Sequence, residues 1–287
     1  GSGAYGFEAL SRGASKAYFE MIDKLNIKNN DELYILGDIF DGNSQNPKAC
    51  IDILADIMAH ENYHLILGDH EYVHIMYEMS KQEEAVQKIW LEMLMDEDFE
   101  GAALHKYIYE KLSEKERNYY FGYLLRCDLT DYVQIGKRIF YLVHGSPQRI
   151  KNDNISEWQC DVCMNPINLE KNYQLSILKD PGLENGHPLP KDCNTENTFI
   201  LCGHIPTTEY KKIVDIEKYG EDATKDKVYV PEIIVYKHKI LLDCGCTADE
   251  LIKEQPDKNL ACLAVDAAGY FVTYYRPDIE RKNFDNE

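Results

Sequence analysis

The sequence has little positive charge and no long apolar run, and both deficits narrow the class of protein. Its 287 residues include 31 Lys and Arg against 50 Asp and Glu, which gives a formal net charge of −19. Nucleic acids and anionic membrane surfaces are bound by clustered basic side chains, so we expect neither as a partner. No apolar stretch approaches the roughly 20 residues of a membrane span, and no secretory signal is visible. An anionic substrate would need a locally positive pocket.

The sequence also lacks a cysteine framework. Its nine cysteines are an odd number and are scattered through the apparent strands and helices. That distribution is typical of reduced thiols and predicts a cytoplasmic protein rather than a disulfide scaffold. Cys160 and Cys163 have the spacing of half a zinc knuckle. Because no second matched pair follows, we do not expect a structural zinc ion there.

Apolar periodicity organises the amino-terminal part of the chain. After a first strand, a helical face covers residues 14–25 and a short apolar strand covers residues 33–36. Asn46 and Pro47 form a good helix start, and a third strand covers residues 64–67. Three strands joined by two helices predict a parallel α/β arrangement. A chain of this length is expected to form a single domain, residues 1–287.

The rest of the chain is less regular. The helical pattern of residues 71–126 predicts an insertion made of helices. This insertion is either a lid over a site or an ordinary insertion packed on the core. Residues 131–143 predict a hairpin around Gly136-Lys137, and the region after residue 204 predicts a polar excursion followed by further hairpins. Three more features are an irregular Pro-containing region, a strand and a charged tail that we expect to fray, at residues 145–197, 198–202 and 276–287.

Ionisable side chains follow four of the apolar strands directly. Asp38 follows Leu36-Gly37, and Asp69-His70-Glu71 follows Leu67-Gly68. His144 and His204 end two later strands. In an α/β sheet, functional sites are built from the turns that follow strands. Carboxylates and imidazoles at one edge suit a divalent ion, so the pattern predicts a metal site.

The order of these motifs resembles a known family. GDxxD at residues 37–41, GDHE at 68–71, the strand-end His144 and GH at 203–204 resemble the calcineurin-like metallophosphoesterases. The likeness is greatest to bacterial serine/threonine protein phosphatase-like members, and it extends over about residues 5–275. The resemblance implies a two-sheet α/β/β/α sandwich and metal-dependent hydrolysis of phosphoesters in proteins or small molecules.

The resemblance also implies roles for individual residues. Asp38 would bridge two metal ions, and His70 would donate a proton to the leaving group while Asp41 orients it. The ligands implied for the second ion are Asp38, Asp69, His144 and His204.

Three departures from the family pattern affect the first metal ion and the binding of phosphate. The family's opening DxHG aligns with residues 10–13, which places Leu10 and Arg12 at the two ligand positions. Leu10 has no donor atom, and the Arg12 guanidinium offers no lone pair. Gly42 stands where the family has a phosphate-binding Arg. We therefore predict at most one tightly bound ion (Mn, Zn or Fe), with Arg12 as the counter-charge to Asp38 and Asp69.

Three hypotheses about function remain open. The first is a working phosphoesterase with one metal ion, in which Arg12 helps to bind phosphate. The second is an inactive pseudophosphatase that binds or regulates a protein partner. The third comes from His70-Glu71-Tyr72-Val73-His74, which matches the HExxH motif of zinc proteases. That motif belongs within a helix, whereas here it begins directly after a strand, so this hypothesis is the weakest.

Overall fold

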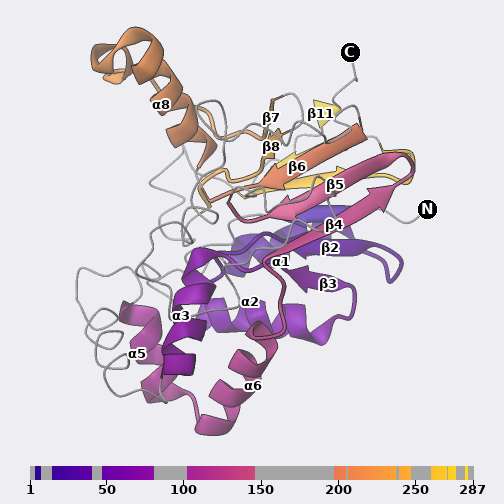
Figure 1. The fold of residues 1–287 in the computed structure, drawn as a ribbon, viewed down its shortest axis with the longest axis vertical. Helices are drawn as coiled ribbons and strands as arrows, with labels where there is room; N and C mark the ends of the chain where they lie inside the picture. The colour runs from indigo at the N-terminus through magenta and orange to yellow at the C-terminus, as the bar shows by residue number, and fades with distance from the viewer. Residues whose placement is uncertain are drawn as a thin grey trace, which may run out of the picture.

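The computed structural model has a mixed α/β fold with two β-sheets (Figure 1). It describes the following residues: 4–7, 15–40, 47–80, 102–145, 197–204, 206–236, 239–246, 260–269, 271–275 and 282–283.

The first sheet contains the predicted amino-terminal β-α-β-α-β unit. Its strands β1 (Ala4–Phe7), β2 (Glu32–Ile35) and β3 (Tyr63–Leu65) pair in parallel. The connections are α1 (Ser15–Leu25) and α2 (Pro47–Ala59). Three carboxy-terminal strands extend this sheet to the order β11-β10-β9-β1-β2-β3: β9 (Ala261–Val265), β10 (Phe271–Tyr275) and β11 (Lys282–Asn283).

The second sheet has the order β4-β5-β6-β8-β7. Its first two strands, β4 (Thr130–Ile135) and β5 (Arg138–Val143), form the predicted hairpin around Gly136, whose φ of 60° suits a glycine. The remaining strands are β6 (Thr198–Cys202), β7 (Ile234–Tyr236) and β8 (Lys239–Leu241). Because β5, β6 and β8 are parallel, their carboxyl ends lie at one edge of the sheet.

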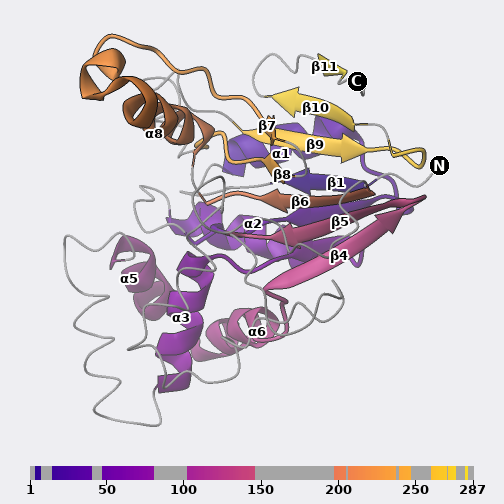
Figure 2. The same cartoon turned by 45° about the horizontal axis from the view of Figure 1, so that its top comes forward.

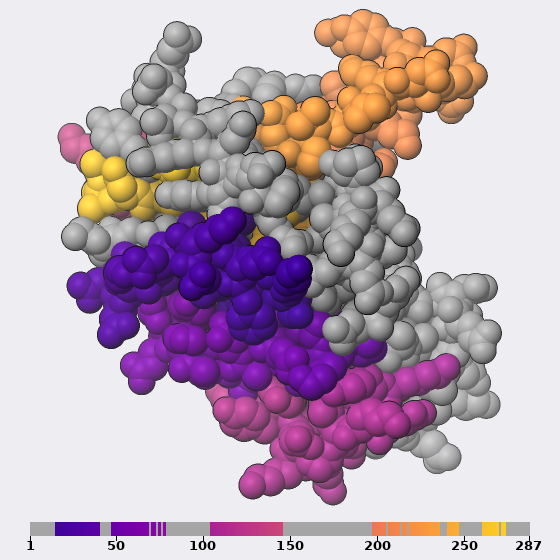
Figure 3. Space-filling model, turned by 180° about the vertical axis from the view of Figure 1, so that it is seen from behind, coloured from indigo at the N-terminus to yellow at the C-terminus, as the bar shows by residue number. Residues whose placement is uncertain are grey.

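Alternating side chains divide the interior into three apolar clusters. In β2, Leu33 and Ile35 pack with α1 and α2, whereas Tyr34 belongs to a cluster shared with the second sheet. In β5, Phe140 enters that shared cluster, whereas Tyr141 packs on the opposite side with Tyr210 of α8 (Thr207–Tyr219). This is the two-residue period of a strand that is buried on both faces. In the view from behind, the residues of α1 and α2 (indigo and violet) lie at the surface of the molecule (Figure 3).

Three described helices lie in or next to the predicted insertion of residues 71–126. They are α3 (Asp69–Ser80), α5 (Ala102–Lys111) and α6 (Glu114–Leu124). The start of α6 is fixed by a capping box, in which Ser113 Oγ accepts from the Glu116 amide and the Glu116 side chain accepts from the Ser113 amide. The role of these helices as a lid stays a prediction.

Two segments differ from the sequence-based expectation. Residues 207–219, expected as a polar excursion, form α8, which together with the 3₁₀ helix Glu221–Thr224 projects from the sheets at the end opposite to α5 and α6 (Figures 1 and 2). Within the tail expected to fray, Lys282 and Asn283 form β11 by pairing with Thr273 and Val272. That part of the expectation was wrong, because the pairing is supplied by β10. Most of the predicted irregular region lies outside the described residues.

Candidate metal centre

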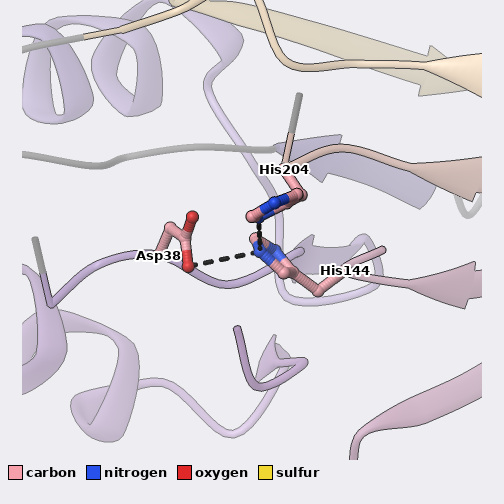
Figure 4. A group of neighbouring side chains, drawn as sticks. All are labelled: Asp38, His144 and His204. Atoms are coloured by element: carbon pink, nitrogen blue, oxygen red, sulfur yellow. Dashed lines mark hydrogen bonds and ion pairs between the residues drawn. The ribbon is translucent and has the colours of Figure 1, made fainter. Parts of the chain in front are cut away.

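Three of the predicted ligands converge where the two sheets meet (Figure 4). Asp38 follows β2, His144 follows β5 and His204 follows β6. One ligand atom from each lies within 4.8 Å of the other two. In the part of the chain that the structure describes, this is the one group of three or more His, Cys, Asp or Glu with such spacing.

His144 is fully buried, and both of its ring nitrogens have polar neighbours. Its Nδ1 lies 2.6 Å from the carbonyl oxygen of Leu36, so Nδ1 carries the proton and donates it. Its Nε2 then presents a lone pair, 3.3 Å from Asp38 Oδ1 and 3.2 Å from His204 Nδ1. A backbone carbonyl that fixes the tautomer of a histidine in this way is a common support of metal-binding imidazoles.

The backbone at this centre adopts conformations that are unfavourable elsewhere. Asp38 and His204 have φ of 57° and 67°, in the left-handed region, and Gly37 has φ of 89°. Left-handed non-glycine residues cost roughly 1–3 kcal/mol each and gather at functional sites. A Cβ on Gly37 would lie 2.5 Å from the Gly68 nitrogen, so only glycine lets the loops after β2 and β3 approach this closely.

Glu71 joins these two loops by hydrogen bonds to their backbone amides. Its carboxylate accepts the amides of Asp38 and Gly68, both at 2.9 Å, and that of Phe40 at 2.7 Å. Burial raises the pKa of the Glu71 carboxyl, and the neighbouring charge of Asp38 adds to that rise. The sequence pointed to Glu71 only as the base of the HExxH motif, not as a support of the metal centre. Its place directly after His70 was the signal that could have pointed to one.

Asp243 is a second buried carboxylate that sequence reasoning passed over. It follows β8, so it lies at the same edge as His144 and His204. Its Oδ1 accepts the Gly245 amide at 2.6 Å, and its carbonyl accepts the Thr207 amide at 2.7 Å. Burial raises its pKa to about 6, with a further contribution from Asp38. The run Leu241-Leu242-Asp243 is the same strand-end pattern that singled out the other residues.

The other predicted site residues are only partly placed. Asp69 is the first residue of α3, and the His70 side chain that follows it is half-buried. The Asp69 side chain, Arg12 and Asp41 lie outside the described residues, as do Leu10 and Gly42. Their roles stay predictions.

The HExxH motif does lie on a helix, because α3 begins at Asp69; the expectation that its helical context is missing was wrong. The motif still lacks the chemistry of a zinc protease. Glu71 is occupied by three backbone amides, so it has no free position as a base. His74 is buried among aromatic rings, with Phe40 at 5.4 Å and Phe121 at 6.5 Å between ring centroids.

The donor set suits a divalent ion. One carboxylate and two imidazoles with converging donor atoms are ligands that Mn, Zn and Fe accept. None of the described helices combines the length and apolarity that crossing a bilayer requires.

Comparison with known proteins agrees with this geometry. The family model of the calcineurin-like phosphoesterases matches residues 11–241. No protein of curated function matches the sequence. A protein serine/threonine phosphatase from Saccharomyces cerevisiae shares the fold with a TM-score of 0.51 at 13% identity, over 98% of this chain and 82% of that one. A hypothetical protein from Pyrococcus horikoshii OT3 is 16% identical over 100% of this chain and 88% of its own, with a TM-score of 0.49. This chain belongs to the calcineurin-like phosphoesterase family, which implies metal-dependent hydrolysis of phosphoesters.

Proposed function

We propose that the protein hydrolyses phosphoesters with one divalent ion at the carboxyl ends of β2, β5 and β6. The observation that carries the proposal is the convergence of Asp38, His144 and His204 within 4.8 Å. These residues come from two sheets and lie far apart in the sequence, so local propensity alone does not bring them together. The complete fold is proposed to be the four-layer α/β/β/α sandwich of the family.

Asp38, His144 and His204 would hold the ion, with Asp69 as a fourth ligand from the start of α3. A bound divalent ion polarises the phosphoryl group and lowers the pKa of water. The Leu36 carbonyl keeps the Nε2 lone pair of His144 aimed at the centre. His70 is half-buried at the start of α3, and it would protonate the leaving-group oxygen with Asp41 orienting its ring.

The restriction to one ion comes from the sequence. Leu10 cannot act as a ligand, and Arg12 supplies positive charge where the family has a metal-binding His. A guanidinium can pair with a carboxylate through two hydrogen bonds, so Arg12 would balance the charges of Asp38 and Asp69. The chain carries a net charge of −19, and a positive group here would also help to attract a phosphate.

A second candidate function is favoured by the same positions. Compared with the family pattern, Leu10 and Arg12 replace two metal ligands, and Gly42 replaces one phosphate-binding side chain. Such a loss is the pattern expected of a pseudophosphatase, in which the fold is kept to bind or regulate a protein partner.

Hydrolysis of p-nitrophenyl phosphate in Mn²⁺ separates the two candidates. We expect weak, metal-dependent turnover that His144→Ala abolishes and that exposed His60→Ala leaves unchanged. Turnover absent in Mn²⁺, Zn²⁺ and Mg²⁺ would favour the pseudophosphatase.

The triple variant Leu10→Asp, Arg12→His, Gly42→Arg tests the role of Arg12. Restoring the family pattern should raise turnover by about 100-fold, the order associated with one lost transition-state contact. Turnover that stays at or below the wild-type level would contradict the assignment of residues 10–13 to the first metal motif.

A further inference from the structure

The loops after β2 and β3 are joined by one side chain. Glu71 has no exposed surface. Its Oε2 accepts two amides, one from each loop, at Asp38 and Gly68, and its Oε1 accepts the amide of Phe40. All three partners are backbone groups, and two of them lie more than 30 residues away in the sequence.

Two of these amides, those of Asp38 and Phe40, belong to the turn that places the Asp38 carboxylate. Gly37 and Asp38 both have positive φ, a conformation that persists in a non-glycine residue only where its surroundings hold it. The Asp38 amide points to Glu71, and on the other side of the same residue Asp38 Oδ1 lies 3.3 Å from His144 Nε2. Glu71 therefore fixes the backbone position from which the Asp38 side chain reaches His144.

A neutral side chain of the same shape could not do this fully. A carboxylate has two acceptor oxygens, whereas an amide has one acceptor oxygen and an NH₂ that only donates. In Glu71→Gln, either the Phe40 amide or the pair from Asp38 and Gly68 would face another donor. A buried N–H without an acceptor is costly, so the turn would shift to find one.

We propose that Glu71 is a positioning residue of the metal centre, which holds Asp38 in its strained turn so that the carboxylate meets His144 and His204. This inference rests on the proposed function. Both carboxylate oxygens of Glu71 are engaged by backbone amides, so it acts through the backbone of Asp38, Phe40 and Gly68.

The test is the Mn²⁺ dissociation constant of Glu71→Gln, measured by isothermal titration calorimetry. We expect it to rise 10- to 100-fold, the usual effect of losing a group that supports a metal ligand. Excess Mn²⁺ should restore kcat. The matched control is Glu110→Gln on the exposed face of α5, which should bind as the wild type does. A Glu71→Gln variant with a lowered melting temperature and an unchanged dissociation constant would overturn the proposal.

Amide exchange keeps the proposal testable if Glu71→Gln does not fold. In the metal-free wild type, NMR should find the amides of Asp38, Phe40 and Gly68 protected as strongly as those of β2. Exchange of these amides at the rate of open loops would overturn the proposal. If the wild type binds no Mn²⁺ while the three amides are protected, the proposed function fails. The hydrogen bonds by which Glu71 joins the two loops would then still be supported.

Discussion

Two buried histidines, His144 at the sheet edge and His74 in α3, show how differently one side chain is used in two regions. His144 has a backbone carbonyl at one nitrogen and a carboxylate and a second imidazole at the other. His74 packs edge-on against Phe40 and stacks near His105, and burial lowers its pKa to about 3. Burial alone therefore does not mark a site. The polar groups that surround the ring decide between a metal ligand and a core residue.

Glycine substitutions should give the largest contrast between the two regions. A Cβ on Gly68 would lie 2.6 Å from the Asp38 amide nitrogen and 2.9 Å from Glu71 Oε2, whereas a Cβ on Gly122 in α6 meets nothing within 4 Å. We expect Gly68→Ala to lower the free energy of unfolding by about 3 kcal/mol and to weaken metal binding. Gly122→Ala should raise it by about 0.5–1 kcal/mol, since alanine favours a helix.

Urea denaturation with added Mn²⁺ and without it measures both effects. Equal destabilisation by the two substitutions would contradict the close approach of the loops after β2 and β3.

The pH dependence of stability should come next in size. The folded-state pKa of His74 lies near 3, below the unfolded value of about 6.5. The free energy of unfolding is therefore not reduced by His74 above pH 6.5. It falls as the pH drops from 6.5 toward 3, because the unfolded chain takes up a proton on His74 before the folded chain does. By pH 5 the loss from this residue should be about 2 kcal/mol.

His74→Phe keeps an aromatic ring in the cluster and removes the titration. The difference in unfolding free energy between pH 7 and pH 5 should shrink by that same amount in His74→Phe, and it should keep its wild-type size in His60→Phe, whose ring is exposed. A pH dependence that His74→Phe leaves intact would show that His74 is not the residue that titrates.

The smallest effect is expected at the start of α6. Ser113→Ala removes the side-chain oxygen that accepts the Glu116 amide and so should cost about 1 kcal/mol of stability. Because this cap lies in the helical region and not at the sheet edge, metal affinity should not change. Thermal unfolding together with a Mn²⁺ titration checks both halves of the prediction, and a clear loss of affinity would mean that the two regions are coupled.

Much of the strand arrangement could be predicted from the sequence. The apolar run of β6 was predicted with its observed bounds, and the turn at Gly136-Lys137 was expected from the glycine. The approach of Asp38, His144 and His204 was also expected, since each directly follows an apolar strand, although Asp38 comes from the first sheet and the two histidines from the second. The calcineurin-like family likewise follows from the order of these motifs.

What the sequence did not predict depends on contacts between distant parts of the chain. β11 exists through its pairing with β10, and among the described side chains of α8 only those of Thr207 and Thr208 are buried, so an apolar face does not mark this helix. Glu71 shows the same limit most clearly. Its position in the motif was visible, but its three amide partners depend on how the two loops fold back on it.

The number of metal ions per chain tests the central claim most directly. Protein purified without chelator, analysed by inductively coupled plasma mass spectrometry, should carry at most one Mn, Zn or Fe per chain, and His144→Ala should carry none. Two ions per wild-type chain, both lost in His144→Ala, would contradict the account of Leu10 and Arg12. A wild-type chain that stays metal-free in excess Mn²⁺ would contradict the metal centre itself.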